Sequence, residues 1–222
     1  MKRSALCLAL FGWPISAADD PPVQAPVALY VKFESQPPAV AVVTLERELR
    51  AILAPVGFDF AWRSVDETTN EVWTELAVVT FKGHCSTDSL ARKGQFSGGA
   101  LGWTHVSDGR VLPFAEVDCS RIGDLVGGRL FAFTARVREK VFQRAVARVA
   151  AHELYHVFTG KTVHGSWGVA KAEFSTEELL SDSFRFEGEN ARALRRKGAQ
   201  DLLQFVRRAP LPAPVAPDSA SH

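Results

Sequence analysis

The sequence predicts an α+β domain, in which a mixed, twisted sheet of four to five strands packs on an N-terminal helix and a long later helix, with a smaller helical C-terminal part. Three observations predict this fold class. Apolar residues alternate in short segments before residue 119, they recur at helical spacing in longer segments, and the two kinds of segment are interleaved. Strands joined through a helix pair in parallel and strands joined by a tight turn pair antiparallel, so the sheet is mixed.

The first elements follow the order strand, helix, strand, strand. Apolar residues alternate over 27–33 and over 58–62, which is typical of half-buried strands. Between these segments, apolar residues recur at helical spacing over 42–56, and Gly57 ends that helix. The nearly continuous apolar run at 76–81 is typical of a buried central strand.

A β-hairpin is predicted next, from strands at 100–106 and 111–118. The residues between them at 107–110 (Ser-Asp-Gly-Arg) are typical of a tight turn. Pro113 has no N–H to donate to a neighbouring strand, so it is expected to mark the start of the second pairing.

The rest of the chain is predicted to be helical. A long helix spans about 134–159 and ends at Gly160, Ser175 with Glu178 forms a capping box for another helix, and an amphipathic helix covers about 191–207. The expected apolar stripe of the long helix consists of Val137, Val141, Phe142, Ala145, Val146 and Val149.

Composition and termini predict an exported single domain. The chain has 222 residues, of which 46 % are hydrophobic and 23 % charged, the balance of a soluble globular protein. Lys2 and Arg3, an apolar run at 5–13 and small residues at 16–18 form the pattern of an export signal. We therefore expect a signal peptide at 1–18, a flexible segment at 19–26, one domain at 27–208 and a Pro-rich disordered tail at 209–222, in the periplasm or outside the cell.

Charge and hydropathy bear on the class of partner. The net charge of +1 gives no electrostatic basis for binding nucleic acid. After the signal, no apolar run is long enough to cross a bilayer. We therefore expect neither a nucleic-acid partner nor a membrane span.

The cysteines predict a disulfide. Signal cleavage would remove Cys7 and leave Cys85 and Cys119, an even pair in an exported protein. Each follows a predicted strand. If those two strands are parallel neighbours, the cysteines lie at the same edge of the sheet, within bridging distance.

A five-residue motif, His152-Glu153-Leu154-Tyr155-His156, lies on the long helix. Its two histidines are four residues apart, so both imidazoles project from one face and can bind one ion. Glu153 is rotated by about 100° from His152, so it flanks the metal. There it can take a proton from a water molecule that zinc makes acidic. The motif predicts an endopeptidase with one catalytic zinc ion and Glu153 as general base, and the export signal predicts that it is secreted.

A catalytic zinc has three protein ligands and an open position, so a third ligand is needed. His164 is the nearest candidate, because Gly160 lets the chain reverse and Gly165 eases a close approach to the helix end. The rival ligands, on or near the next helix, are Glu173, Glu177 and Glu178.

These residues resemble the zincin metallopeptidases, and within them the metzincins. The likeness in element order covers about residues 27–165. It implies that His152, His156 and His164 bind zinc and that Glu153 acts as base. The family pattern is H-E-x-x-H-x-x-G-x-x-H followed by a methionine turn. Here Gly160 and His164 come four and eight residues after His156, and Met1 is the only methionine.

The resemblance also implies a substrate-binding edge strand above the cleft. The segment 98–104 lies where that strand is expected, so Leu101, Gly102, Trp103 and Thr104 are candidates to bind a peptide. A bare strand edge offers backbone donors and acceptors to an extended peptide. The alternative is an ordinary hairpin strand.

Two functional alternatives stay open at this point. One keeps the zinc peptidase but takes the third ligand from a glutamate. The other is an exported zinc-binding or interaction module without catalysis. Glu153 argues against the second, because a purely structural zinc site has no use for a general base and usually has four protein ligands.

Overall fold

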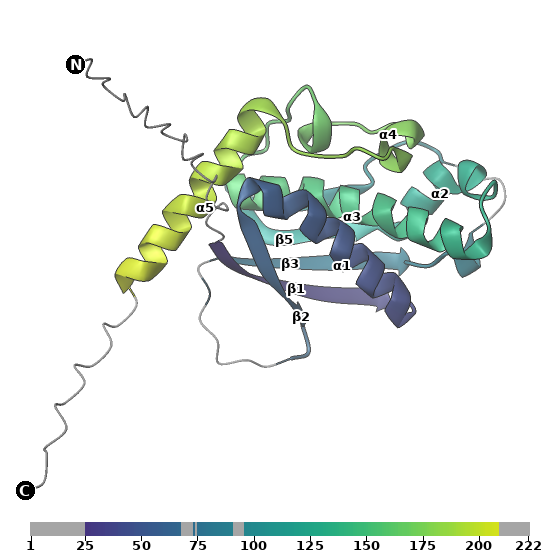
Figure 1. The fold of residues 1–222 in the computed structure, drawn as a ribbon, viewed down its shortest axis with the longest axis horizontal. Helices are drawn as coiled ribbons and strands as arrows, with labels where there is room; N and C mark the ends of the chain where they lie inside the picture. The colour runs from purple at the N-terminus through teal and green to yellow at the C-terminus, as the bar shows by residue number, and fades with distance from the viewer. Residues whose placement is uncertain (1–24, 68–72, 74, 91–95, 209–222) are drawn as a thin grey trace, which may run out of the picture.

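The computed structural model describes residues 25–67, 73, 75–90 and 96–208 (Figure 1). The predicted signal peptide and the Pro-rich tail lie outside these described residues, as do residues 19–24. The first strand begins at Ala25, two residues inside the segment that was predicted to be flexible.

Five strands form one sheet in the order β2-β1-β3-β5-β4. All neighbouring strands pair in parallel except β4 and β5, so the predicted mixed sheet of an α+β fold is confirmed. The strands are β1 Ala25–Ser35, β2 Phe58–Ser64, β3 Glu75–His84, β4 Gly102–Ser107 and β5 Arg110–Asp118.

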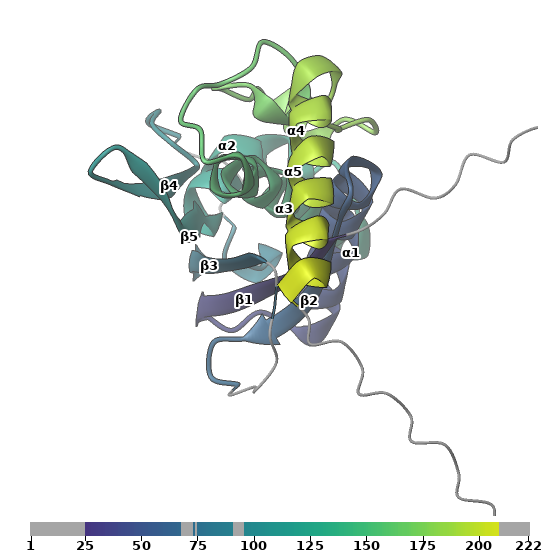
Figure 2. The same ribbon diagram turned by 90° about the vertical axis from the view of Figure 1, so that its left-hand side faces the viewer.

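The helices gather on one face of this sheet, where α1 and α3 lie side by side (Figures 1 and 2). Within the described ranges, none of the helices has the length and apolar character needed to cross a membrane. The α-helices are α1 Ala39–Leu53, α2 Cys119–Leu130, α3 Ala135–Thr159, α4 Thr176–Leu180 and α5 Gly188–Arg208; short 3-10 turns occupy Ala54–Val56, Thr87–Ser89 and Gly168–Ala170.

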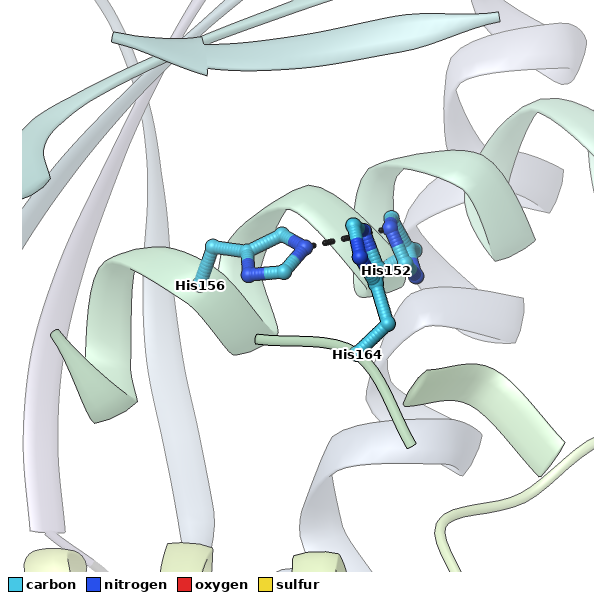
Figure 3. Close-up of side chains that lie close together, drawn as sticks. All are labelled: His152, His156 and His164. Carbon is cyan, nitrogen blue, oxygen red and sulfur yellow. Dashed lines mark hydrogen bonds between the residues drawn. The ribbon is translucent and has the colours of Figure 1, made fainter. Parts of the chain in front are cut away.

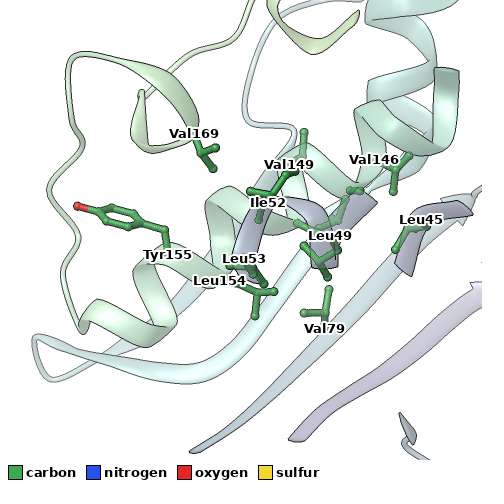
Figure 4. Packing of buried hydrophobic residues seen from close by; sticks show 14 of the residues in the cluster. Leu45, Leu49, Ile52, Leu53, Val79, Val146, Val149, Leu154, Tyr155 and Val169 are labelled. Carbon is green, nitrogen blue, oxygen red and sulfur yellow. The ribbon is translucent and has the colours of Figure 1, made fainter. Parts of the chain in front are cut away.

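The core lies between the sheet and the helix pair α1 and α3 (Figure 4). Leu49 and Leu53 of α1, Leu154 of α3 and Val79 of β3 meet there and are at most 1 % exposed. A fully buried side chain of this size contributes about 1.5–3 kcal/mol to folding. The last turns of α3, which contain the histidine motif, are therefore held firmly against the sheet.

The long helix has the predicted bounds but not the whole predicted stripe. It begins after Thr134 and ends at Gly160, whose φ of 63° lies in the left-handed region that favours glycine. Four residues of the stripe are buried, namely Phe142, Ala145, Val146 and Val149, and Val141 is half-buried. Val137, the first residue of the predicted stripe, is 43 % exposed, so the buried face of the helix begins later than predicted. Helical spacing identifies a face, but it does not show how far along the helix the packing extends.

Helix α2 was missed in the sequence. It contains Gly123, Gly127 and Gly128, and glycine is among the weakest helix formers. Tertiary packing buries Ile122 and Val126 and overrides that local preference. The side chain of Asp118 caps the helix by accepting from the N–H of Arg121 at 3.0 Å.

The structure joins Cys85 to Cys119 in a disulfide, with their α-carbons 5.0 Å apart. Strands β3 and β5 are parallel neighbours, with Lys82 opposite Asp118. The two cysteines therefore follow at the same edge of the sheet, as the sequence analysis expected.

The hairpin turn and Pro113 also behave as predicted. Asp108 and Gly109 both have positive φ, the conformation of a tight hairpin turn. The pairing of β4 with β5 shifts register around Pro113, and pairing of β5 with β3 begins only at Phe114. Pro113 therefore lies at a position where no backbone N–H is needed for pairing with a neighbouring strand.

Candidate metal site and cleft

The two motif histidines project from the last turns of α3 toward a common point (Figure 3). Each is only 6 % exposed. The Nδ1 atom of His152 lies 2.7 Å from the carbonyl oxygen of Val169, and the Nδ1 atom of His156 lies 2.6 Å from that of Lys161. Since a carbonyl oxygen only accepts, each Nδ1 carries the proton and each Nε2 presents a lone pair.

Both imidazoles are neutral near pH 7. Burial lowers the pKa of His152 to about 4, against the opposing effect of its hydrogen bond to Val169. Burial also lowers the pKa of His156. Neutral imidazole is the form that binds a metal ion, so these two side chains need no deprotonation before binding.

The two Nε2 atoms lie 3.2 Å apart (dashed line in Figure 3). Two lone pairs at this distance repel each other unless a cation interacts with both. Two nitrogen ligands of a tetrahedral zinc ion, each about 2.0–2.1 Å from the metal, lie about 3.3 Å apart. The observed spacing therefore fits zinc ligation by both histidines.

His164 comes from the loop after α3 and faces the same point (Figure 3). Its ring is parallel to that of His152 at 5.2 Å between centroids, and perpendicular to that of His156 at 4.8 Å. One ligand atom from each of the three histidines lies within 4.8 Å of the others. Three imidazoles with one open side form the ligand set of a catalytic zinc site.

Two of the three glutamates considered as alternative ligands, Glu177 and Glu178, form ion pairs with basic side chains. Glu178 accepts from the N–H of Ser175 at 2.8 Å and pairs with Lys171. Glu177 is an exposed side chain that pairs with Arg129. Glu173 lines the cleft, yet among the described residues no glutamate joins the motif histidines in a group of three potential ligands.

The carboxylate of Glu153 is buried beside the histidines and held by the edge strand. It is 4 % exposed, and the hydroxyl of Thr104 donates to its Oε2 at 2.8 Å. Gly102 leaves room for it, because a Cβ there would lie 3.0 Å from Oε1. Burial raises the pKa of Glu153 to about 7, although the hydrogen bond from Thr104 acts in the opposite direction. A carboxylate with a pKa near neutrality can both take and return a proton.

A cleft of about 660 Å³ opens in front of these groups. Its lining includes the three histidines, Glu153 and all four of the edge-strand candidates, Leu101, Gly102, Trp103 and Thr104. Leu125, Val149 and Phe174 add an apolar part. The structure thus brings every site residue predicted from the sequence, apart from the disulfide cysteines, to one cleft.

Strand β4 lies at an edge of the sheet and, among the described strands, pairs only with β5. The N–H of Asp118 donates to the carbonyl of Leu101 at 2.8 Å, so these two residues form a hydrogen-bonded pair. Such pairs alternate along an antiparallel ladder. Gly102 and Thr104 therefore direct their N–H and C=O groups away from β5, toward the open edge.

The sequence analysis did not predict the groups that orient the histidines. The carbonyls of Lys161 and Val169 give no sequence signal, because every residue has a carbonyl. The ring of Phe174 lies edge-on to His152 at 5.3 Å, and no local pattern indicates that contact.

Comparison with known proteins gives one distant structural match. No protein-family model and no curated protein matches the chain. Among solved structures, the chain is similar to an archaemetzincin from Methanopyrus kandleri, with 13 % sequence identity and a TM-score of 0.44 over 78 % of this chain and 95 % of that one. The function proposed below rests on the residues of the site.

Proposed function

We propose that this protein is a zinc-dependent endopeptidase. The observation that supports the proposal most directly is the pair of Nε2 atoms of His152 and His156, facing each other at 3.2 Å with His164 beside them. A buried carboxylate, that of Glu153, adjoins the same cleft. A structural zinc site would be closed by a fourth protein ligand, whereas this one opens into a cleft large enough for a peptide segment.

The chemistry proposed for the site is hydrolysis of a peptide bond. Zinc, when bound, lowers the pKa of water and polarises a carbonyl. Glu153 takes one proton from water in the cleft, and the resulting hydroxide adds to the carbonyl carbon. Glu153 then returns the proton to the leaving nitrogen as the C–N bond breaks. The hydroxyl of Thr104 holds the carboxylate in place during both transfers.

We propose that substrates bind as an added strand along β4. The outward N–H and C=O groups of Gly102 and Thr104 are arranged as a strand edge that a peptide can pair with. Backbone pairing of this kind takes the interior of a chain and needs no free terminus. This favours cleavage at internal bonds.

Export is part of the same proposal. The disulfide between Cys85 and Cys119 supports it, because such bonds persist in oxidising compartments. The expected signal peptide, residues 1–18, would direct the chain to the export machinery.

The test is metal analysis of the purified protein together with digestion of a broad peptide library. We expect one zinc ion per chain, cleavage that stops with chelator and returns with zinc, and loss of cleavage by about 10²–10⁴-fold in Glu153→Gln with zinc still bound. Full activity of Glu153→Gln would refute the mechanism. Bound zinc with no cleavage of any peptide would instead support the non-catalytic zinc-binding module.

A further inference from the structure

His164 differs from the other two histidines in how it is held. His152 and His156 each have a backbone carbonyl as a partner for Nδ1. In the part of the chain that the structure describes, no such partner is seen for His164, which is also exposed. Its position therefore depends on the backbone of its loop, and on whatever holds that loop against α3.

Asn190, in the first turn of α5, contacts both α3 and the loop that contains His164. Tyr155, inside the histidine motif and 3 % exposed, donates its hydroxyl to Oδ1 of Asn190 at 3.0 Å. The same amide lies directly under Gly165, the residue after His164. A Cβ at Gly165 would stand 2.2 Å from Nδ2 and 3.3 Å from Cγ of Asn190.

A side chain at position 165 would meet this amide first. Gly165 is not among the glycines with positive φ, so its backbone conformation does not itself exclude alanine. Its N–H donates to the carbonyl of Ala170 at 2.6 Å, and an added Cβ would also lie 3.3 Å from the Cβ of Ala170. The loop backbone at Gly165 thus packs against both Ala170 and the amide of Asn190.

We propose that Asn190 is a positioning residue for the third metal ligand. Its amide, anchored by Tyr155, acts as a spacer between α3 and the loop and sets the place of His164 opposite His152 and His156. This inference rests on the proposed function, because it concerns zinc ligation by the three histidines. Groups that orient metal ligands typically change metal affinity by about 10–100-fold when removed.

The test is a double-mutant cycle read out as the zinc dissociation constant, measured by competition with a chelator at constant pH. Asn190→Ala should weaken zinc binding by about tenfold or more. Gly165→Ala should weaken it as well, because the new Cβ meets the amide. In the Asn190→Ala background the added loss from Gly165→Ala should largely disappear, since the 2.2 Å clash with the amide is gone and the remaining 3.3 Å contact with the Cβ of Ala170 needs only a small shift.

Leu194→Ala is the matched control. Leu194 lies on α5, is fully buried and contacts the core, so its truncation lowers the melting temperature of the metal-free protein. It should leave the zinc dissociation constant unchanged, whereas Asn190→Ala should change it.

Three results would overturn the inference. They are unchanged zinc affinity in Asn190→Ala, an equal loss from Gly165→Ala in both backgrounds, or a loss in Leu194→Ala as large as that in Asn190→Ala. Failure of the wild-type protein to bind zinc would be a different result, since it would refute the proposed function and this inference with it.

Discussion

The hydroxyl of Thr104 lies 2.8 Å from Oε2 of Glu153 and 3.1 Å from the carbonyl oxygen of the same residue. This contact joins the edge strand to the helix that holds the motif histidines. A peptide that pairs with β4 would therefore bind to the same strand that orients the proposed base.

Thr104→Val removes the hydroxyl and keeps the shape of the side chain. The hydrogen bond lowers the pKa of Glu153, so its loss should raise that pKa and move the acidic limb of the kcat profile to higher pH. We also expect kcat to fall by about tenfold. The measurement is kcat against pH for wild type, Thr104→Val and Thr104→Ser. The serine variant keeps the donor and should resemble wild type; superimposable profiles for all three would contradict the role given to Thr104.

Glu153→Gln should make the metal-free protein more stable at neutral and alkaline pH. Burial raises the folded-state pKa of Glu153 from 4.5 to about 7, so the folded state holds the proton more tightly than the unfolded state. The cost of ionisation is absent below pH 4.5, grows as pH rises toward 7, and is complete above it. It amounts to about 3 kcal/mol.

The measurement is the free energy of unfolding of both chelator-treated proteins across this pH range. His152 is common to both, so its own titration cancels in the difference. A stability difference that does not change between about pH 4 and pH 8 would show that Glu153 is not a buried, proton-retaining carboxyl.

Gly102→Ala should lower activity on the order of 10²-fold, because the added Cβ would lie 2.8 Å from the carbonyl of Glu116 and 3.0 Å from Oε1 of Glu153. The carboxylate would have to move away from its place. Gly128→Ala is the control, since a Cβ there has open space. The measurement is kcat/KM of both variants. Equal activity in the two would mean that the absence of a side chain at Gly102 is not needed to place the Glu153 carboxylate.

His164→Ala should weaken zinc binding by orders of magnitude, because it removes one of three ligands. Glu173→Ala removes a carboxylate from the cleft lining but leaves all three clustered histidines in place. Its zinc content should therefore remain normal. Zinc content after dialysis against a weak chelator compares them. The reverse pattern would assign the third ligand to the glutamate.

Unfolded, unreduced mature protein should show no free thiol, because Cys85 and Cys119 are joined. The bond closes a loop with a sequence separation of 34 residues, for which the chain-entropy model gives about 4 kcal/mol of stabilisation. Replacing both cysteines with alanine should lower the unfolding free energy by a similar or smaller amount. Thiol titration and denaturant unfolding check both statements, and two free thiols would exclude the bridge.

Local periodicity was sufficient for much of this fold. The repeat of a helix places His152, Glu153 and His156 on adjoining faces of one turn, whatever surrounds them. Alternation predicted the strands over 27–33 and 58–62, and the turn at Asp108 and Gly109 reverses the chain through its own backbone preferences. Each of these features depends on neighbours within a few residues, which the sequence states directly.

Contacts between distant segments were decided only by the tertiary structure. Helix α2 forms despite three glycines because packing buries one of its faces. Thr104 meets Glu153 across 49 positions, and Asn190 meets Tyr155 across 35. The sequence could leave the third ligand only as a choice between His164 and three glutamates. In the described part of the structure, His164 and none of the glutamates groups with the motif histidines. The sequence could not decide this, because the position of a loop depends on distant segments that pack against it, and here Gly165 contacts Asn190 of α5.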